Sequence, residues 1–173
     1  MMQQLKQWAG YAEAPDWQLI RLPYVGGELS MRLLLPRAVR HDPSELSAFL
    51  QPLLGPATVM TRSAVDLTMP KWDTSSALSL LDTLRGLGLT DLSDLSGIAP
   101  GLAVSDAVHR ANITVDEEGS EAAAATGIAV ATGAFGPGPS TPVMRVDRPF
   151  VWAVVHEPTG TPTFVGSVVD PTA

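Results

Sequence analysis

Apolar and polar positions in the first half of the chain follow patterns that are typical of strands. Residues 17 to 36 contain two apolar runs of strand length, and Val25-Gly26-Gly27 lies between them. Because a Gly-Gly pair between two such runs is a strong turn signal, we predict a β-hairpin here. Residues 63 to 69 alternate between apolar and small or polar side chains. This alternation predicts a strand with one buried face.

Two short helices are also predicted. Asp42 can cap a helix that has Pro43 at its first position and continues to Leu50, and we expect Pro52 to end it. A second helix should open at Thr74-Ser75-Ser76 and end near Gly86 and Gly88. Its leucines recur at threefold spacing, so we expect them to belong to the core; they are Leu78, Leu81, Leu84 and Leu87.

The last part of the chain predicts more strands. Residues 102 to 117 are rich in β-branched side chains and predict one long strand. Residues 148–156 and 162–169 are apolar runs on either side of Glu157-Pro158-Thr159-Gly160, which predicts a closing hairpin. We find no internal repeat and no domain boundary. The sequence therefore predicts a single α+β domain over residues 1–173, in which strands dominate and helices are short.

Composition and charge narrow the class of protein. A chain of 173 residues can bury roughly 70% of its unfolded surface, and 45% hydrophobic with 17% charged residues is typical of a globular domain. The net charge is 11 minus 18, or −7, which disfavours nucleic acid as a partner. No apolar run approaches the length of a membrane span, the Lys and Arg residues are scattered, and residues 1 to 8 lack a secretory signal. We expect neither a nucleic-acid nor a membrane partner.

Residues suited to catalysis or metal binding lack the required spacing. The three histidines, His41, His109 and His156, are far apart in the sequence. The chain has no cysteine, which excludes disulfides and thiolate chemistry. Neither a Gly-x-Ser-x-Gly nucleophile elbow nor a phosphate-binding Gly-x-x-x-x-Gly-Lys-Ser/Thr loop occurs. We therefore expect no enzyme active site, no metal and no cofactor.

The most unusual stretch spans residues 118 to 142, which carry no charge after Glu121 and contain seven alanines between Ala122 and Ala134. If the chain is extended, alternate residues from Ser120 to Val130 share a small, uncharged face, which a sheet could bury without stranding a charge. Gly119 permits a sharp change of direction at the base. The composition alone leaves a flexible linker and an alanine-rich helix open.

The run EEGSEAAAATGIAVATG, which starts at Glu117, resembles the hinge and reactive-centre loop of the serpins. In that family an acidic pair, Gly, Ser or Thr, Glu and an alanine run recur. The hinge residues implied by this resemblance are Glu117, Glu118, Gly119, Ser120, Glu121, Ala122, Ala123, Ala124, Ala125 and Thr126.

Further similarity to the serpins occurs in family order along the whole chain. Leu22-Pro23-Tyr24 resembles part of the family's central hairpin, and Arg148-Pro149-Phe150-Val151 resembles part of its carboxy-terminal signature. The similarity covers essentially all 173 residues but only about the carboxy-terminal half of a full serpin. It implies a multi-sheet serpin-like fold from which the amino-terminal half is missing.

The resemblance implies a protease inhibitor, not an enzyme. Serpins inhibit serine proteases by acting as a substrate whose reaction is not completed. The protease cleaves the exposed loop, an acyl-enzyme forms, and the freed loop inserts into the central sheet as a new strand, which distorts the protease. In this chain the reactive-centre loop would span about residues 118–145.

The family's usual spacing from Glu117 implies a bait bond at Gly133-Ala134. Because the interval that follows is long and rich in Pro and Gly, the bonds Thr132-Gly133, Ala134-Phe135 and Phe135-Gly136 remain open. Small residues at this point suit a serine protease of elastase- or subtilisin-like preference. The loop carries no Lys or Arg before Arg145, which argues against a trypsin-like target.

The missing half affects both the sites and the partners that the resemblance implies. His109 matches the serpin histidine of a polar cluster beneath the central sheet, although a core histidine bonded to a backbone carbonyl is an equal alternative. The other members of that cluster come from the absent half, and so does the strand that would pair beyond the inserted loop. We expect the chain alone not to trap a protease.

Strand edges left open by the absent half predict aggregation or pairing with another polypeptide, such as the missing amino-terminal half. A non-inhibitory interaction module and a nonfunctional remnant remain open as alternatives. The resemblance is compatible with an extracellular and with a cytoplasmic location.

Overall fold

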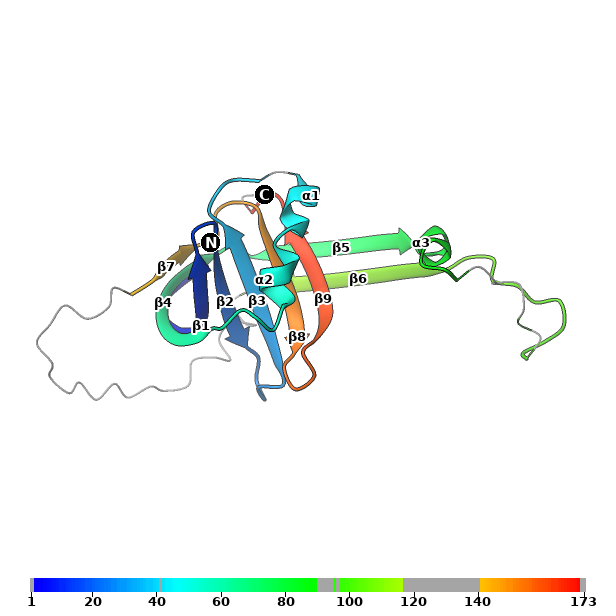
Figure 1. The fold of residues 1–173 in the computed structure, drawn as a ribbon, viewed down its shortest axis with the longest axis horizontal. Coiled ribbons are helices and arrows are strands. Elements are labelled where there is room, and N and C mark those ends of the chain that lie inside the picture. The colour runs from blue at the N-terminus through cyan, green and yellow to red at the C-terminus, as the bar shows by residue number, and fades with distance from the viewer. Residues whose placement is uncertain (1, 41, 90–94, 96, 117–140, 172–173) are drawn as a thin grey trace, which may run out of the picture. The chain divides into compact units, whose positions relative to one another are not determined.

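The structure of the chain is a computed structural model that describes residues 2–40, 42–89, 95, 97–116 and 141–171. The chain divides into two compact units. We call residues 1–72 with 116–173 the sheet unit, and residues 73–115 the ribbon unit. Strands dominate the described part of the chain and the helices are short, which confirms the strand-dominated α+β prediction (Figure 1).

The sheet unit contains a seven-stranded sheet in the order β7-β4-β1-β2-β3-β8-β9. Neighbouring strands are antiparallel except for β4 and β7, which are parallel. The strands are β1 (Met2–Ala14), β2 (Trp17–Pro23), β3 (Leu29–Pro36), β4 (Thr61–Met69), β7 (Val143–Arg145), β8 (Phe150–His156) and β9 (Thr161–Val168). Pairing of β3 with β8 joins the two hairpins from opposite ends of the chain.

The predicted hairpin over residues 17 to 36 is confirmed by β2 and β3, which pair from Trp17↔Pro36 to Pro23↔Ser30. Gly26 and Gly27 have φ angles of 89° and 73°, which side chains with a Cβ rarely adopt. The Tyr24 amide closes the turn by donating to the Leu29 carbonyl at 2.9 Å. The glycine pair therefore fixes the register of this hairpin.

Two more strand predictions are confirmed, and one strand was missed. β4 buries Val65, Leu67 and Met69 on one face, as the alternation predicts. β8 and β9 form the predicted closing hairpin. The sequence gave no prediction for β1, because its many polar residues show no strand alternation. Pairing with β2 on one side and β4 on the other makes this segment a strand.

Two short helices, α1 (Pro43–Ser47) and α2 (Leu50–Leu54), cover one face of the sheet (Figure 1). Asp42 caps α1 as predicted, since its carboxylate accepts from the Ser44 amide at 2.8 Å. The expectation that Pro52 ends the helix is wrong. Pro52 lies in the first turn of α2, where its missing N–H has no intrahelical acceptor to lose.

The helices and the sheet share a buried apolar cluster. Its buried members are Leu19, Leu34, Leu46, Phe49, Leu53, Val151, Ala153 and Val155. Three more aromatic side chains of the sheet unit pack together: the Trp72 ring lies 5.3 Å from Phe150, edge on, and 6.3 Å from Trp152. The first six residues of β8 are all buried, so this strand lies at the centre of the core.

The ribbon unit contains a two-stranded sheet of β5 (Trp72–Ser79) and β6 (Val108–Val115), with α3 (Leu81–Gly86). The prediction of a helix from Thr74 is wrong, because residues 74–79 continue β5. The leucines are not core: Leu78 is 55% exposed, Leu87 is 80% exposed, and α3 buries no residue. Threefold leucine spacing was taken as a helical period, whereas β-branched and small polar residues beside β6 form a strand.

The long strand predicted over residues 102 to 117 is shorter in the structure. β6 begins only at Val108, after Asp106 has turned back to accept from the Ala107 amide at 2.8 Å. The predicted glycine stop is confirmed, because Gly88 has a φ of 96° directly after α3.

Candidate functional site

The segment that carries the predicted reactive-centre loop connects Asp116 to Thr141. The hinge, Glu117 to Thr126, and the bait bond Gly133-Ala134 both lie outside the described residues, and so do the three alternative bonds. These assignments therefore stay predictions. The structure does describe the strands that precede and follow this segment, and each can be considered by itself.

The strand before the segment is β6, whose last residue, Val115, is buried. Within the described residues, β6 pairs with β5 on one edge only. Its other edge thus presents backbone N–H and C=O groups without a strand partner in that part of the chain. An edge of this kind is the structural requirement for accepting an added strand.

The strand after the segment is anchored in the sheet unit. β7 pairs with β4 in the register Asp66↔Val143 to Thr68↔Arg145. The Asp66 amide donates to the Pro142 carbonyl at 2.9 Å, and the Val146 amide donates to the Thr68 carbonyl at 2.8 Å. The buried Gln18 side chain adds a bond from its Nε2 to the Val143 carbonyl at 3.0 Å. This end of the expected loop is therefore fixed from residue 142 onward.

His109 lies on β6 and is exposed. Its side chain is therefore not that of a buried core histidine in this chain. Its proposed place in a polar cluster depends on residues that the chain does not contain, so that role stays a prediction. His156 lies on β8, where its Nδ1 is 2.8 Å from the Thr159 hydroxyl, and His41 lies outside the described residues.

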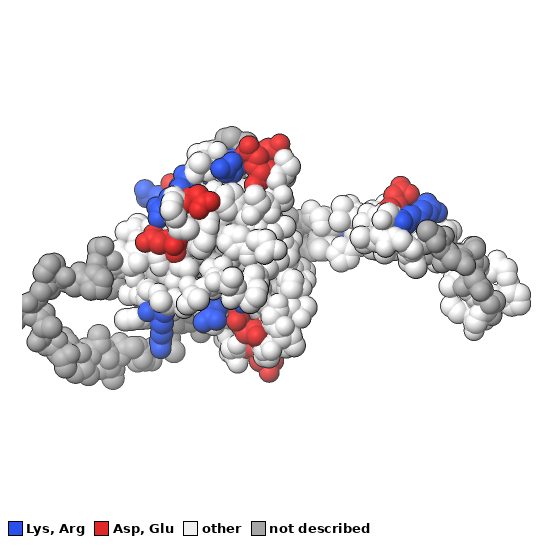
Figure 2. All heavy atoms as spheres, in the orientation of Figure 1, with Lys and Arg blue, Asp and Glu red and all other residues white. Residues whose placement is uncertain are grey.

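Other kinds of site were sought in the part of the chain that the structure describes. No group of three or more His, Asp or Glu residues there could hold a metal ion. None of the described helices is long and apolar enough to span a membrane. On the face drawn in Figure 2, acidic and basic side chains of the described residues lie near one another instead of forming a basic field. This mixed pattern offers no continuous attraction for phosphates.

The most extensive polar cluster was missed by sequence reasoning. The Glu157 carboxylate accepts from Arg32 at 3.2 Å, from Arg21 at 3.3 Å, and from the hydroxyl of the fully buried Ser30. Arg32 also donates to the Leu53 carbonyl at 3.3 Å. These four side chains, which we call the Glu157 cluster, come from β2, β3 and the turn after β8. No spacing in the sequence links them, because sheet pairing brings them together.

Opposing effects set the protonation of Glu157. Burial raises its pKa, but hydrogen bonds from Ser30 and Arg32 and the positive charges of Arg32 and Arg21 lower it further, so that the net pKa lies below the ordinary value. The carboxylate is thus held ionised at the end of the β8–β9 hairpin. The arrangement contains no nucleophile paired with a base, so it is suited to holding two hairpins together, not to catalysis.

Comparisons with known proteins agree with the strands described here. Residues 1–171 match the family described as "Serpin (serine protease inhibitor)". Serpin B11 from Homo sapiens is 32% identical over 172 residues, covering 93% of this chain and 43% of the relative. Serine protease inhibitor 42Dd from Drosophila melanogaster is 40% identical over 170 residues, covering 94% of this chain and 43% of the relative.

Solved structures give the same result. The crystal structure of Serpin48 from Tenebrio molitor superimposes with a TM-score of 0.74 at 29% identity, covering 96% of this chain and 44% of that chain. A serpin from the trematode Schistosoma haematobium gives a TM-score of 0.75, covering 95% of this chain and 45% of the other. The chain spans less than half the length of these relatives. It belongs to the serpin family.

Proposed function

We propose that this chain is the carboxy-terminal portion of a serpin-type inhibitor and carries its bait loop at about residues 118–145. The observation that carries the proposal is the hinge-like run from Glu117 to Thr126, which follows directly after β6 and precedes the anchored β7. The proposed bait bond is Gly133-Ala134. The proposed target is a serine protease of elastase- or subtilisin-like preference, because the residues around that bond are small.

The proposal includes a dependence on further polypeptide. Loop insertion needs a strand on each side of the incoming segment, and β6 can supply only one of them. In the described part of the chain the ribbon unit has two strands, and a two-stranded sheet is marginally stable by itself in water. We therefore propose that the chain alone is cleaved as a substrate, and that trapping requires polypeptide equivalent to the rest of its longer relatives.

Incubation of the purified chain with pancreatic elastase, subtilisin and trypsin tests this function. Elastase and subtilisin should cut between residues 130 and 136, while trypsin should not cut before Arg145 in the loop. Denaturing electrophoresis should show two product bands and no protease-linked band, and mass spectrometry of the products should identify the bond. A variant with Ala134→Asp is the matched control, because a charged residue beside the bond should slow cleavage there without altering the described strands.

Each result decides one part of the proposal. A denaturant-resistant complex would support the inhibitory loop but contradict the dependence on further polypeptide. First cleavage outside residues 117–145 by both small-residue proteases would contradict the bait assignment. An uncleaved loop that nevertheless retains another protein would favour the non-inhibitory interaction module.

A further inference from the structure

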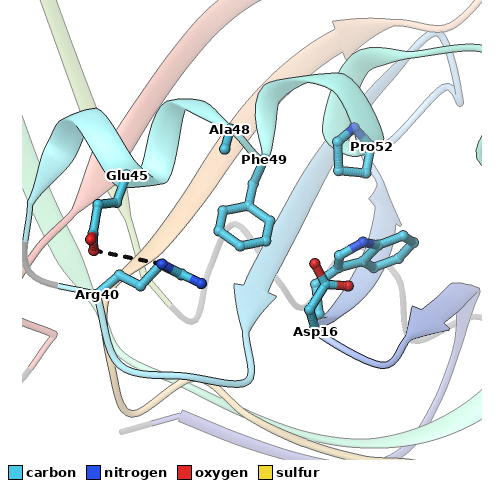
Figure 3. Close-up of a pocket in the computed structure, with 7 residues that line it drawn as sticks. Asp16, Arg40, Glu45, Ala48, Phe49 and Pro52 are labelled. Carbon is cyan, nitrogen blue, oxygen red and sulfur yellow. Dashed lines mark ion pairs between the residues drawn. The ribbon is translucent and has the colours of Figure 1, made fainter.

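A cavity opens beside α1 and α2, on the sheet unit (Figure 3). Its volume is about 510 Å³, which is within the range of small-molecule sites. It is lined by Asp16, Trp17, Arg40, Glu45, Ala48, Phe49 and Pro52. The Phe49 ring lies between the Arg40–Glu45 pair and the side chains of Asp16 and Pro52. The walls are thus largely aromatic and apolar, and charged groups stand at the rim.

The charges at this rim favour a cation. Arg40 is the single basic residue of the lining, and it already faces Glu45 at 3.8 Å. Its guanidinium carbon also lies 5.7 Å from the centre of the Phe49 ring, so the cavity already holds one guanidinium against an aromatic face. The Asp16 carboxylate, in contrast, accepts no hydrogen bond from the described residues. Two carboxylates against one guanidinium leave the lining with a formal charge of −1.

We propose that this cavity binds the guanidinium group of a small amphiphilic cation. The charged head would pair with Asp16, and the apolar body would lie against Trp17 and Pro52. A planar guanidinium suits this site because it can accept a carboxylate on its edge and an aromatic ring on its face. The ligand can be a free alkylguanidine or an arginine side chain of a peptide, since both present the same head group. This binding is independent of the bait loop.

A second cavity of the same chain provides a comparison. It has a volume of about 420 Å³ and is lined by Ser75, Ser76, Ala77, Arg110, Ala111 and Asn112. Its lining has one basic residue, no carboxylate and no aromatic ring. Similar size with opposite charge means that a cation should enter the first cavity and not the second.

Titration of the ¹⁵N-labelled full chain with n-butylguanidine tests the proposal by NMR. The indole N–H of Trp17, assigned by Trp17→Phe, should shift in a saturable way with a dissociation constant on the order of 1 mM, because one exposed carboxylate and a few ring contacts each contribute little. The neutral analogue n-butylurea and the anion butyrate should bind at least tenfold more weakly. A blocked Gly-Arg-Gly tripeptide distinguishes the two sources: tighter binding than butylguanidine assigns the site to a peptide arginine.

The variant Asp16→Asn should weaken butylguanidine binding about fivefold. Asp16 uses its backbone carbonyl, not its side chain, to hold the Arg37 amide at 2.8 Å, so the substitution preserves that contact. Glu28→Gln is the matched control, since it removes the same charge from the exposed β2–β3 turn and should leave affinity unchanged. Equal affinity for butylurea, no effect of Asp16→Asn, or shifts centred on residues 75–77 and 110–112 would overturn the proposal.

Discussion

The sheet unit and the ribbon unit contain similar apolar side chains but bury them very differently. The sheet unit holds almost every buried residue of the described chain, including the fully buried Phe150, Leu34 and Val146. In the described part of the ribbon unit, Val115 is the one residue classed as buried, whereas Leu78, Leu87 and Ile98 are each more than half exposed. Apolar content therefore does not decide burial in this chain; the number of strands and helices available to cover it does.

The difference has a physical cause in the layers that each unit contains. β8 has a strand on each side and α2 packed over it, so both of its faces can be buried. β5 and β6 have each other and one six-residue helix. A stable fold needs at least two packed layers around a core. The exposed leucines are the expected result when a family member spans about 43% of its relatives' length.

The largest expected effect separates the two units by core truncation. Phe150→Ala should lower the free energy of unfolding by about 3–5 kcal/mol, because a fully buried aromatic ring leaves a cavity beside Trp72. Leu87→Ala should change it by less than about 0.5 kcal/mol, because that side chain is 80% exposed. Urea unfolding, followed by far-UV circular dichroism and by tryptophan fluorescence, measures both.

A large loss of stability in Leu87→Ala would contradict this contrast. It would mean that the leucine is covered in solution, and sedimentation at several protein concentrations would then show whether a second copy covers it. Concentration-independent monomers with a stable Leu87→Ala variant would instead support exposed leucines in the isolated chain.

A smaller effect is expected from adding one methyl group in each unit. A Cβ at Gly166 would lie 2.5 Å from Cζ2 of Trp152, whose ring is already packed near Trp72. Gly166→Ala should therefore cost about 1–3 kcal/mol through overpacking. A Cβ at Gly86 in α3 would meet no atom within 4 Å, so Gly86→Ala should be neutral or slightly stabilising. Thermal unfolding of the two variants side by side checks the difference, and equal losses would refute it.

The sequence predicted the sheet unit better than the ribbon unit. Its two hairpins have clear local signals, namely the glycine pair at 26 and 27 and the apolar runs around Glu157-Pro158, and both are confirmed. The helix predicted from Thr74 is wrong because leucine spacing is the same evidence for a helix face and for an exposed strand end. Only pairing with β6, a long-range contact, decides between them.

Prediction of the site divides in the same way. The hinge run could be found because its order along the chain is the signal, and it stays a prediction. The Glu157 cluster could not be found, because Arg21, Arg32 and Glu157 meet only after β2, β3 and β8 pair. A charged residue at a hairpin end is ordinary surface composition until the sheet places two arginines beside it.

The smallest expected effect compares an ion pair from each unit as pH changes. Since the pKa of Glu157 is lowered in the folded chain, its contribution to stability is present above the unfolded value of about 4.3 and is lost as pH falls through the folded pKa. Glu157→Gln should therefore destabilise the chain by about 1 kcal/mol at pH 7, and the difference should shrink as the pH approaches 3.

Asp82→Asn in the ribbon unit is the control for this pH series. Asp82 faces Arg85 at 3.2 Å, but the two side chains are 95% and 56% exposed, so water and salt screen the pair. Its loss should change stability by less than about 0.5 kcal/mol at any pH. If Glu157→Gln shows the same flat profile, the Glu157 cluster contributes no more than a surface pair, and the greater stability of the sheet unit must then come from apolar burial alone.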